Sequence, residues 1–488
     1  ELSCCRFTSA GVYRLPAKPS TNSAVCVGRM SRRVQGRRPR GCTPLLWLGL
    51  FVLSLSVRFA VGIGSSSVSV QEPFLKVPPF LSEARFTFKT INARLKEKFH
   101  EEMDNIYHRF SSSLKQYGAG RKNRVGVLLV NLGSPDAPTR RGLRKYLREF
   151  LSDRRVIEVP RLIWKPILHG IILPFRSPDS AAKYRNVWTE EGSPLISITK
   201  RQVARLQDIV DRRYGTVEGG ASEGEGEEGN ESLPIPMQRS RVLVEWAMRY
   251  GTPSVAAGLR KLREEGCRHI LVFPLYPQTC AATTTTVFDV VAQELAREKK
   301  DRKTGAESWR MFPHLRFVSG YGDHPSYIKA LASRVKRHWT KAGKRRRLVM
   351  SFHGIPADLI KKGDAYACFC SKTARLLAEE LKLGEEEFDM VFQSRFGSTE
   401  WLQPYCDERL EEIAAEGHEE VDVICPGFSA DCLETLDEIQ REYGELFHQA
   451  HEKRGTTGRL FYIKALNDSP EGMQMLGDIV DENLQGWL

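Results

Sequence analysis

Residues 125–135 have the sequence VGVLLVNLGSP and decide how the rest of the chain is interpreted. A nearly continuous apolar run leads directly into asparagine, glycine and proline, which is typical of a buried strand that ends in a turn. Similar short runs alternate with longer segments of helical period, at 242–246, 270–275, 315–318, 348–352, 388–392, 421–425 and 460–463. Apolar strands separated by crossover helices predict an α/β fold with parallel sheets covered by helices on both faces.

Changes in composition divide the chain into segments. A basic cluster at 341–347 precedes a new strand, so we place a boundary between a first Rossmann-like domain at 121–340 and a second at 341–488. The first domain contains a Gly/Glu/Ser-rich stretch, 216–238, that cannot bury enough apolar area to fold and is interpreted as a surface insertion. Residues 65–120 are interpreted as a linker or an appended amphipathic helix.

The first 64 residues have the pattern of a targeting leader. Arginines follow Met30, and the apolar run 45–57 comes after them. This run is too short for a comfortable membrane span, and Arg58 interrupts its extension. We predict a mitochondrial destination with inner-membrane association. A plastid-type organelle is the alternative, because the same layout resembles a secretory signal. Much of the net charge of +13 lies in the first 120 residues, which disfavours nucleic-acid binding.

The cysteine pattern indicates a reducing compartment. Eleven cysteines occur in 488 residues, without paired CxxC spacing or a CxxC motif followed by histidines. Cys368 and Cys370, together with Cys406 and Cys425, could ligate an unusual iron–sulfur cluster, although a C-x-C pair is a weak signal.

Polar residues that directly follow the apolar runs are the first candidates for chemistry, because ligands of parallel sheets bind at the carboxyl ends of the strands. No GxGxxG motif opens a helix and no GxxxxGK[ST] motif is present, which disfavours nucleotide binding. His353 follows the run 348–352 and precedes Gly354; a structural histidine is the alternative interpretation.

A second candidate is an acidic stripe behind Pro426-Gly427. Its members fall at intervals of three, four and seven and would share one helical face: Asp431, Glu434, Glu438 and Glu445. Such a stripe can also be a solvated helix surface. Carboxylates with one imidazole suit divalent iron or cobalt in transit, without a thiolate cage that would retain the metal.

The third candidate is an apolar and cationic surface. Residues 164–175 are strongly apolar and form either buried core or an exposed lip. Nearby guanidinium and hydroxyl groups could hold the carboxylates of a large flat ligand: Arg176, Arg249, Tyr184 and Ser193. Trp401 could stack on that ligand or fill core. Together these features suggest a tetrapyrrole.

The chain from Val125 to Leu488 resembles the ferrochelatase family. The resemblance is carried by VLLVNLGSPD, KYRNVW with GSPL, FPLYPQ, SFHGIP, GDAYACFC, FQSRFGSTEWLQPY, PGFSADCLETLDEI and LNDSPEGM. The last three resemble alphaproteobacterial ferrochelatases more closely than animal ones. The resemblance implies the chelatase fold, with two similar Rossmann-like domains, four-stranded parallel sheets and the porphyrin in the cleft between the domains.

The resemblance also implies roles for individual residues. His353 and Glu434 match the family's catalytic histidine and glutamate, and the implied iron ligands are His353, Glu434, Asp431 and Glu438. Porphyrin-contacting positions are Leu132, Arg176, Tyr184, Ser193 and Arg249, and Tyr276 and Trp401 match the pocket wall. An animal-type two-iron two-sulfur cluster is not expected, because no cysteine trio lies near Leu488 and Ala281 occupies the internal ligand position.

We therefore expect an enzyme that inserts Fe²⁺ into protoporphyrin IX to form protoheme, the terminal step of heme biosynthesis, with iron as substrate and no required cofactor. The alternatives are a coproporphyrin ferrochelatase, a cobalt or nickel tetrapyrrole chelatase, and a non-catalytic tetrapyrrole carrier. His353 would accept protons on one face of the porphyrin while Glu434 supplies iron from the other, or the two would share both roles. Peripheral membrane contact is expected, and a homodimer is compatible with the resemblance.

Overall fold

The computed structural model describes residues 98, 100–104, 124–218, 238–297 and 308–488. The leader at 1–64 and the organelle address assigned to it lie outside the described residues, as does nearly all of the segment 65–120. Within the described ranges, no helix combines the length and the apolar content needed to cross a bilayer.

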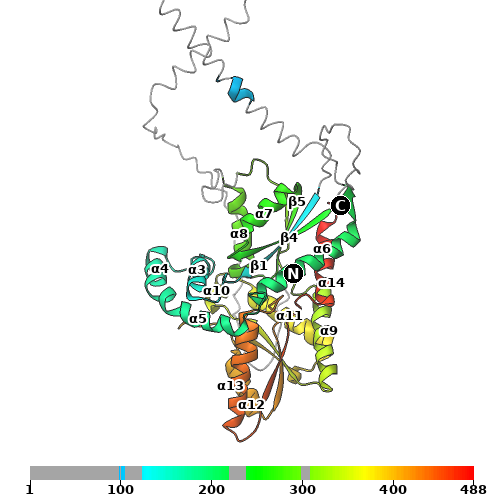
Figure 1. Cartoon of the computed structure of the whole chain (residues 1–488). Coiled ribbons are helices and arrows are strands. Elements are labelled where there is room, and N and C mark those ends of the chain that lie inside the picture. The colour runs from blue at the N-terminus through cyan, green and yellow to red at the C-terminus, as the bar shows by residue number, and fades with distance from the viewer. Residues whose placement is uncertain (1–97, 99, 105–123, 219–237, 298–307) are drawn as a thin grey trace, which may run out of the picture. The chain divides into compact units, whose positions relative to one another are not determined.

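Two parallel four-stranded sheets form the framework (Figure 1). The first has the order β4-β1-β5-β6, formed by β1 (Arg124–Gly133), β4 (Val242–Tyr250), β5 (Cys267–Pro274) and β6 (His314–Phe317). The second has the order β10-β9-β7-β8, formed by β7 (Arg347–His353), β8 (Phe388–Gln393), β9 (Glu420–Ile424) and β10 (Arg459–Ile463). All eight apolar runs are strands, so the predicted fold class is confirmed.

The strands are apolar along their length because both faces of each sheet are covered. In β1, Leu128 and Val130 face a core formed with α7 (Val255–Glu264) and α8 (Thr286–Leu295), whereas Val127 and Leu129 face the opposite core. All four side chains are fully buried. Burial on both faces removes the apolar–polar alternation of a half-exposed strand.

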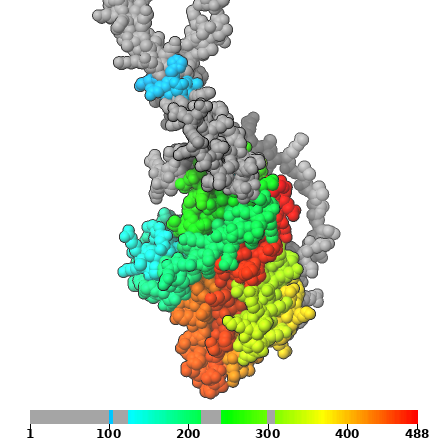
Figure 2. All heavy atoms as spheres, turned by 45° about the vertical axis from the view of Figure 1, so that its right-hand side comes forward, coloured from blue at the N-terminus to red at the C-terminus, as the bar shows by residue number. Residues whose placement is uncertain are grey.

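One core connects the two sheets. The core that contains Val127 also contains Met350 of β7, with helices α6 (Pro194–Tyr214), α9 (Pro325–Ala342), α11 (Tyr366–Leu381) and α14 (Pro470–Leu484) around it. Helix α9 packs on α11 of the second half, and the C-terminal α14 packs back on α6 of the first. Figure 2 shows the C-terminal residues, in red, against the green first half. The domain boundary at 340/341 stays a prediction, since these helices cross it.

The predicted insertion at 216–238 begins and ends in a short hairpin stem. Strand β2 (Thr216–Glu218) pairs antiparallel with β3 (Gln238–Ser240), so the two ends of the insertion lie side by side. The remainder of the insertion lies outside the described residues.

A helical arm follows β1 and α3 (Arg140–Phe150). It consists of α4 (Arg161–Ile167), the π-helix η1 (Leu168–Ile172) and α5 (Leu173–Val187). Leu168 and Leu173 are fully buried, whereas Leu162 and Phe175 are 92% and 72% exposed. The apolar stretch is therefore buried core on one face and exposed surface on the other. We call residues 161–176 the lip.

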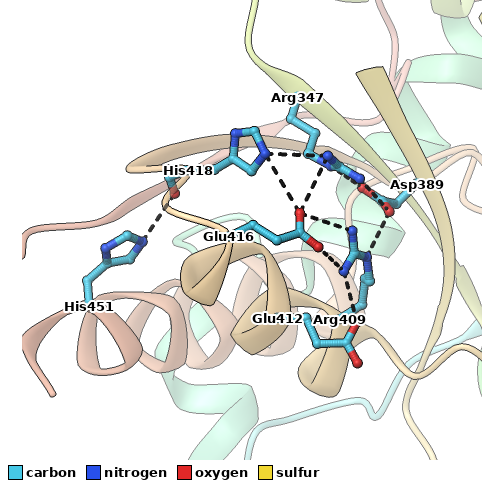
Figure 3. A network of polar contacts seen from close by, with 7 residues as sticks. All are labelled: Arg347, Asp389, Arg409, Glu412, Glu416, His418 and His451. Atoms are coloured by element: carbon cyan, nitrogen blue, oxygen red, sulfur yellow. Dashed lines mark hydrogen bonds and ion pairs between the residues drawn. The ribbon is translucent and has the colours of Figure 1, made fainter. Parts of the chain in front are cut away.

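A network of charged side chains lies at the amino ends of β7 and β8, opposite to the ends that carry His353 and Gln393 (Figure 3). Asp389 accepts hydrogen bonds from Arg347 at 2.6 and 3.1 Å and from Arg409 at 2.8 Å. Arg409, on α12 (Cys406–Ala415), also donates to Glu412 and Glu416. This network ties α12 to the sheet and takes no part in the candidate site.

Candidate active site

His353 is the last residue of β7, where the strand leaves the buried core. Its Nδ1 lies 2.6 Å from the carbonyl oxygen of Gly354, so the proton belongs on Nδ1 and the lone pair on Nε2. The ring is partly exposed, and its centroid lies 6.5 Å from that of Trp401. The geometry leaves Nε2 as the atom that can accept a proton.

Two glycines allow the close packing at these strand ends. A Cβ on Gly354 would lie 3.0 Å from the carbonyl oxygen of Gln393 and 3.1 Å from the Trp401 ring. Gly133, at the end of β1, has a φ of +116°, and a Cβ there would lie 1.7 Å from the carbonyl oxygen of Tyr250. Gly133 therefore requires glycine, whereas a Cβ at Gly354 would push its neighbours apart by a few tenths of an ångström.

Glu434 and Glu438 lie on the π-helix η4 (Glu434–Tyr443), which continues as α13 (Gly444–Glu452). The Glu438 carboxylate accepts hydrogen bonds from Ser394 Oγ at 2.5 Å, Tyr443 Oη at 3.1 Å and Gln393 Nε2 at 3.3 Å. Burial raises the pKa of Glu438, and the nearby charge of Glu434 raises it further. His353 acts in the opposite direction, which places the imidazole and both carboxylates in one electrostatic neighbourhood.

Asp431 is placed differently from the prediction. It precedes η4, is buried, and accepts hydrogen bonds from Tyr462 Oη at 2.6 Å, Asn467 Nδ2 at 2.7 Å and the Ala465 amide at 3.1 Å. These contacts use both carboxylate oxygens to fix the loop after β10. The assignment of Asp431 as an iron ligand is therefore not supported by its surroundings.

Glu445, the last carboxylate of the predicted stripe, is placed on the following helix. Glu445 is exposed on α13 and accepts a hydrogen bond from Gln449 at 2.7 Å. The stripe was derived from 3.6 residues per turn, but ten residues of η4 are π-helical, and each wider turn shifts the phase of every residue after it. Glu434 and Glu438 remain electrostatic neighbours, whereas Asp431 is held by Tyr462 and Asn467, and Glu445 by Gln449.

Buried tyrosines line the other side of Glu434. Tyr184, on α5, lies beside Ser134 and Glu434, and burial followed by the Glu434 charge raises the pKa of its phenol. The hydroxyl of Tyr276 is buried and makes no hydrogen bond to any described residue. Leu132 packs on the buried face of the lip, near Trp164 and Leu168. Tyr184, Tyr276 and Leu132 pack against three different apolar clusters.

Tyr146 is a neighbour of the site that the sequence did not indicate. Its hydroxyl donates to the Gly133 carbonyl at 3.2 Å, and burial, Tyr184 and Glu434 raise its pKa. It comes from the middle of α3, and no local pattern distinguishes it from a core residue. Gln393 was also missed, although it ends a predicted strand and could have been found by the same rule as His353.

The two predicted arginines differ in what they can bind. Arg249 already forms a close ion pair with Asp153 and donates to the Thr286 carbonyl at 2.9 Å, so a substrate carboxylate would have to displace Asp153. Arg176 pairs with no described carboxylate; its guanidinium lies 4.0 Å above the ring of Phe396, and burial lowers its pKa. Arg176 is therefore the better anion-binding candidate.

Ser193 and Trp401 take up positions at the edges of the site. Ser193 is buried at the amino end of α6, and its side chain makes no capping hydrogen bond there. Trp401 Nε1 donates to the Phe396 carbonyl at 2.8 Å, which ties the loop that carries Phe396 to the neighbourhood of His353. Through Phe396, the lip and the His353 strand meet in one region.

The four cysteines considered for an unusual cluster are separated. Cys406 and Cys425 belong to one core, Cys370 belongs to another, and Cys368 is exposed. In the parts of the chain that the structure describes, no group of three or more His, Cys, Asp or Glu side chains is arranged to hold a metal ion. This statement includes His353, Glu434 and Glu438, which do not form a preassembled chelate.

The carboxylates of Glu434 and Glu438 beside the imidazole of His353 can transfer a divalent cation without retaining it. The buried tyrosines, the lip and the guanidinium of Arg176 suit a flat, apolar ligand that carries carboxylates. An enzyme with both properties is a tetrapyrrole chelatase. The family model for ferrochelatase matches residues 124–222 and 227–484. The chain belongs to the ferrochelatase family, and it is thus a metal–porphyrin chelatase.

Curated relatives cover most of the described chain. The ferrochelatase of Bordetella pertussis is 47% identical over 365 residues, which is 75% of this chain and 89% of the relative. That of Marinobacter nauticus is 42% identical over 376 residues, 77% and 91% of the two chains. Among solved structures, SirB from Bacillus subtilis with Fe³⁺ is similar at 14% identity and a TM-score of 0.39, covering 75% of this chain and 97% of that one. That likeness is too remote to inform the site.

Proposed function

We propose that the protein inserts Fe²⁺ into protoporphyrin IX to form protoheme, as the terminal step of heme biosynthesis. The observation that carries this proposal is the position of His353. Its free Nε2 lies at a strand end beside Trp401, in the same electrostatic neighbourhood as Glu434 and Glu438. A proton acceptor and hard cation ligands are the two functions that metallation of a porphyrin requires.

The chemistry assigns one task to each group. Two pyrrole N–H protons must leave, and the ferrous ion must lose its water shell. His353 Nε2 accepts protons, because a neutral imidazole nitrogen that carries a lone pair can act as a general base. Glu434 supplies the carboxylate that replaces water on the iron, with Glu438 behind it. Binding the macrocycle in a bent form exposes the nitrogen lone pairs, which favours the transition state over the flat substrate.

The porphyrin is held by apolar walls and one cation. We assign its faces to Leu132, Tyr184, Tyr276 and Trp401. Arg176 binds a propionate, because it is the predicted arginine without a described carboxylate partner. Protoporphyrin is preferred to coproporphyrin because the exposed aliphatic side chains of the lip suit a vinyl-bearing substrate that partitions into membranes.

The decisive experiment is incubation of the purified protein with ferrous iron and protoporphyrin IX while the Soret band is followed. We expect the band to shift to that of protoheme. Coproporphyrin in place of protoporphyrin, and cobalt or nickel in place of iron, should react more slowly. A carrier would bind porphyrin and quench its fluorescence without converting it, and that result would overturn the proposal.

We also propose that the lip contacts a membrane surface peripherally. Leu162, Ile163, Ile171 and Phe175 are exposed, and Arg161 and Lys165 lie between or beside them. Apolar area gains roughly 25 cal/mol per Å² on leaving water, and basic side chains favour anionic headgroups.

Cosedimentation with anionic phospholipid vesicles tests the lip. Replacing both Leu162 and Phe175 by serine should lower the bound fraction severalfold. Met311 and Phe312 are 81% and 65% exposed elsewhere on the surface, so the matched double serine variant there should bind like the parent. Equal binding by all three proteins would contradict the role of the lip.

No iron–sulfur cluster is proposed as a resident cofactor. The expectation rests on the missing animal-type cysteines in the sequence. Absorption spectroscopy and labile-sulfide analysis of protein purified without oxygen test it. A stoichiometric cluster in that preparation would be the contrary result.

For location, we propose a mitochondrial, inner-membrane-associated enzyme, with a plastid-type organelle as the alternative. The relatives named above are bacterial, so the proposal rests on the leader and on the alphaproteobacterial character of FQSRFGSTEWLQPY and PGFSADCLETLDEI. Imaging of the tagged full-length protein against markers for both organelles decides between them.

A further inference from the structure

Gln393 occupies the junction between the strand that carries His353 and the helix that carries the two glutamates. It is the last residue of β8, it is 1% exposed, and its backbone pairs with His353 in the sheet register. Its backbone carbonyl accepts a hydrogen bond from the Gly354 amide at 2.8 Å. The main chain of Gln393 is thereby fixed to the turn beside the imidazole.

The side chain of Gln393 contacts the opposite element. Its Nε2 donates to the backbone carbonyl of Glu434 at 3.1 Å and to the carboxylate of Glu438 at 3.3 Å. Both protons of the amide are therefore directed at the first turn of η4, at two residues that are four apart in sequence. Few side chains reach both the backbone and a carboxylate of the same helical turn.

The amide orientation is determined by its other neighbours. Oε1 accepts a hydrogen bond from Ser351 Oγ at 2.8 Å and one from Cys425 Sγ at 3.6 Å. A flipped amide would place Oε1 against the two oxygen acceptors of η4 and its NH₂ group against the Ser351 hydroxyl. The Ser351 hydroxyl could accept instead of donate, but both contacts to the oxygen acceptors of η4 would be lost, so only the observed orientation satisfies all partners.

We propose that Gln393 is a positioning residue that fixes the distance between His353 and the Glu434–Glu438 turn. This inference rests on the proposed roles of His353 and Glu434. The amide itself touches no substrate. It holds the iron-binding turn in register with the proton acceptor, so that both act on the same porphyrin. Ser394 and Tyr443 also bind Glu438, but neither contacts the backbone of Glu434.

The test compares two buried glutamines, Gln393 at the end of β8 and Gln278 in the loop after β5. Gln393→Met keeps the length of the side chain and removes both donors. Gln278→Met is the matched control: Gln278 is 3% exposed and donates to Thr373 Oγ1 and the Pro426 carbonyl, and it touches neither glutamate. Initial rates are measured with iron varied at saturating porphyrin and with porphyrin varied at saturating iron.

We expect Gln393→Met to lower kcat/KM for ferrous iron about tenfold or more, while the porphyrin dissociation constant from fluorescence quenching changes less than twofold. Gln278→Met should lose comparable stability in urea and keep the parent's KM for iron. Equal kinetic losses in the two variants would reduce Gln393 to a packing residue and overturn the inference.

A second variant serves if Gln393→Met does not fold. Ser351→Ala removes the hydroxyl that orients the amide, and we expect the same iron-specific loss at a smaller, about threefold, size. Unchanged iron kinetics in Ser351→Ala would count against the inference. Glu434→Gln in the same assay distinguishes failure of the proposed function from failure of the inference. Full activity of Glu434→Gln would overturn the proposed role of Glu434. A loss of activity in Glu434→Gln together with normal kinetics of Gln393→Met would overturn only the positioning role of Gln393.

Discussion

At the scale of single residues, the site consists of groups whose state is set by their immediate contacts. The carbonyl of Gly354 fixes the tautomer of His353, and three donors hold the Glu438 carboxylate. Asp431 differs from these residues, because both of its carboxylate oxygens accept hydrogen bonds from residues of β10 and the loop after it. The type of a residue made it a candidate, and the hydrogen bonds of its side chain determined whether that side chain is available for the reaction.

The first prediction concerns the proton acceptor. His353→Ala should reduce iron insertion to background while porphyrin still binds, because a partly exposed strand-end side chain contributes little to core packing. Rates from the Soret change and affinity from fluorescence quenching measure the two quantities. Turnover near that of the parent would remove the central residue of the mechanism.

The second prediction concerns the cation ligand. Glu434→Gln keeps the shape of the side chain and deletes its charge, so kcat should fall at least a hundredfold, about 2.7 kcal/mol of transition-state free energy, with a porphyrin dissociation constant close to the parent's. Steady-state kinetics and fluorescence titration measure both. A parallel loss of turnover and porphyrin affinity would indicate a structural role.

At the scale of elements, helix type and strand order determine which side chains meet. The π-helix η4 separates the stripe expected from the sequence into a site pair and two outlying carboxylates. At the other end of the second sheet, Arg347 and Asp389 come together because β7 and β8 are neighbours. This network at the amino ends stabilises the sheet that carries His353.

The third prediction tests that network. Burial opposes ionisation of Asp389, but hydrogen bonds from Arg347 and Arg409 outweigh it and lower the pKa of the carboxyl. A lowered folded-state pKa gives stability that is present above the unfolded pKa of about 3.9 and is lost as the pH falls through the folded value.

Asp389→Asn should therefore lower the free energy of unfolding at neutral pH by about 2 to 3 kcal/mol and weaken its dependence on pH on the acid side. Urea unfolding over an acid-to-neutral series gives both quantities. Glu412→Gln is the control, because that carboxylate is 64% exposed and binds only the same Arg409. Its effect should stay below about 0.5 kcal/mol; equal effects of the two changes would contradict the account.

At the scale of the whole molecule, the two sheets share a core, and the helices α9 and α14 each pack across the boundary predicted from the sequence. The amino end of this unit is anchored, since Arg124 donates to the Ser240 carbonyl at 2.8 Å and to Glu265 at 2.7 Å. We predict that the catalytic unit begins at β1.

The fourth prediction is that a truncated chain beginning at Arg121 keeps its activity. The family match begins at residue 124, and the site residues all follow it. Iron insertion in detergent solution, measured beside the full-length chain, should agree within about twofold, well below the tenfold change that 1.4 kcal/mol would produce. Loss of activity would assign the leader or the segment 65–120 to the enzyme.

The sequence by itself determined the eight strands, the parallel α/β class and the family, because a strand buried on both faces needs a continuous apolar run that is visible locally. It also made His353 a candidate, because this residue directly follows such a run, and the family resemblance indicated Glu434. Only the tertiary structure decided that Asp153 forms an ion pair with Arg249 and that Asp431 accepts hydrogen bonds from the loop after β10. It also decided that Gln393 joins the strand of His353 to the helix of the two glutamates. Those outcomes depend on contacts between residues from about 30 to about 100 positions apart, and local periodicity carries no information about such partners.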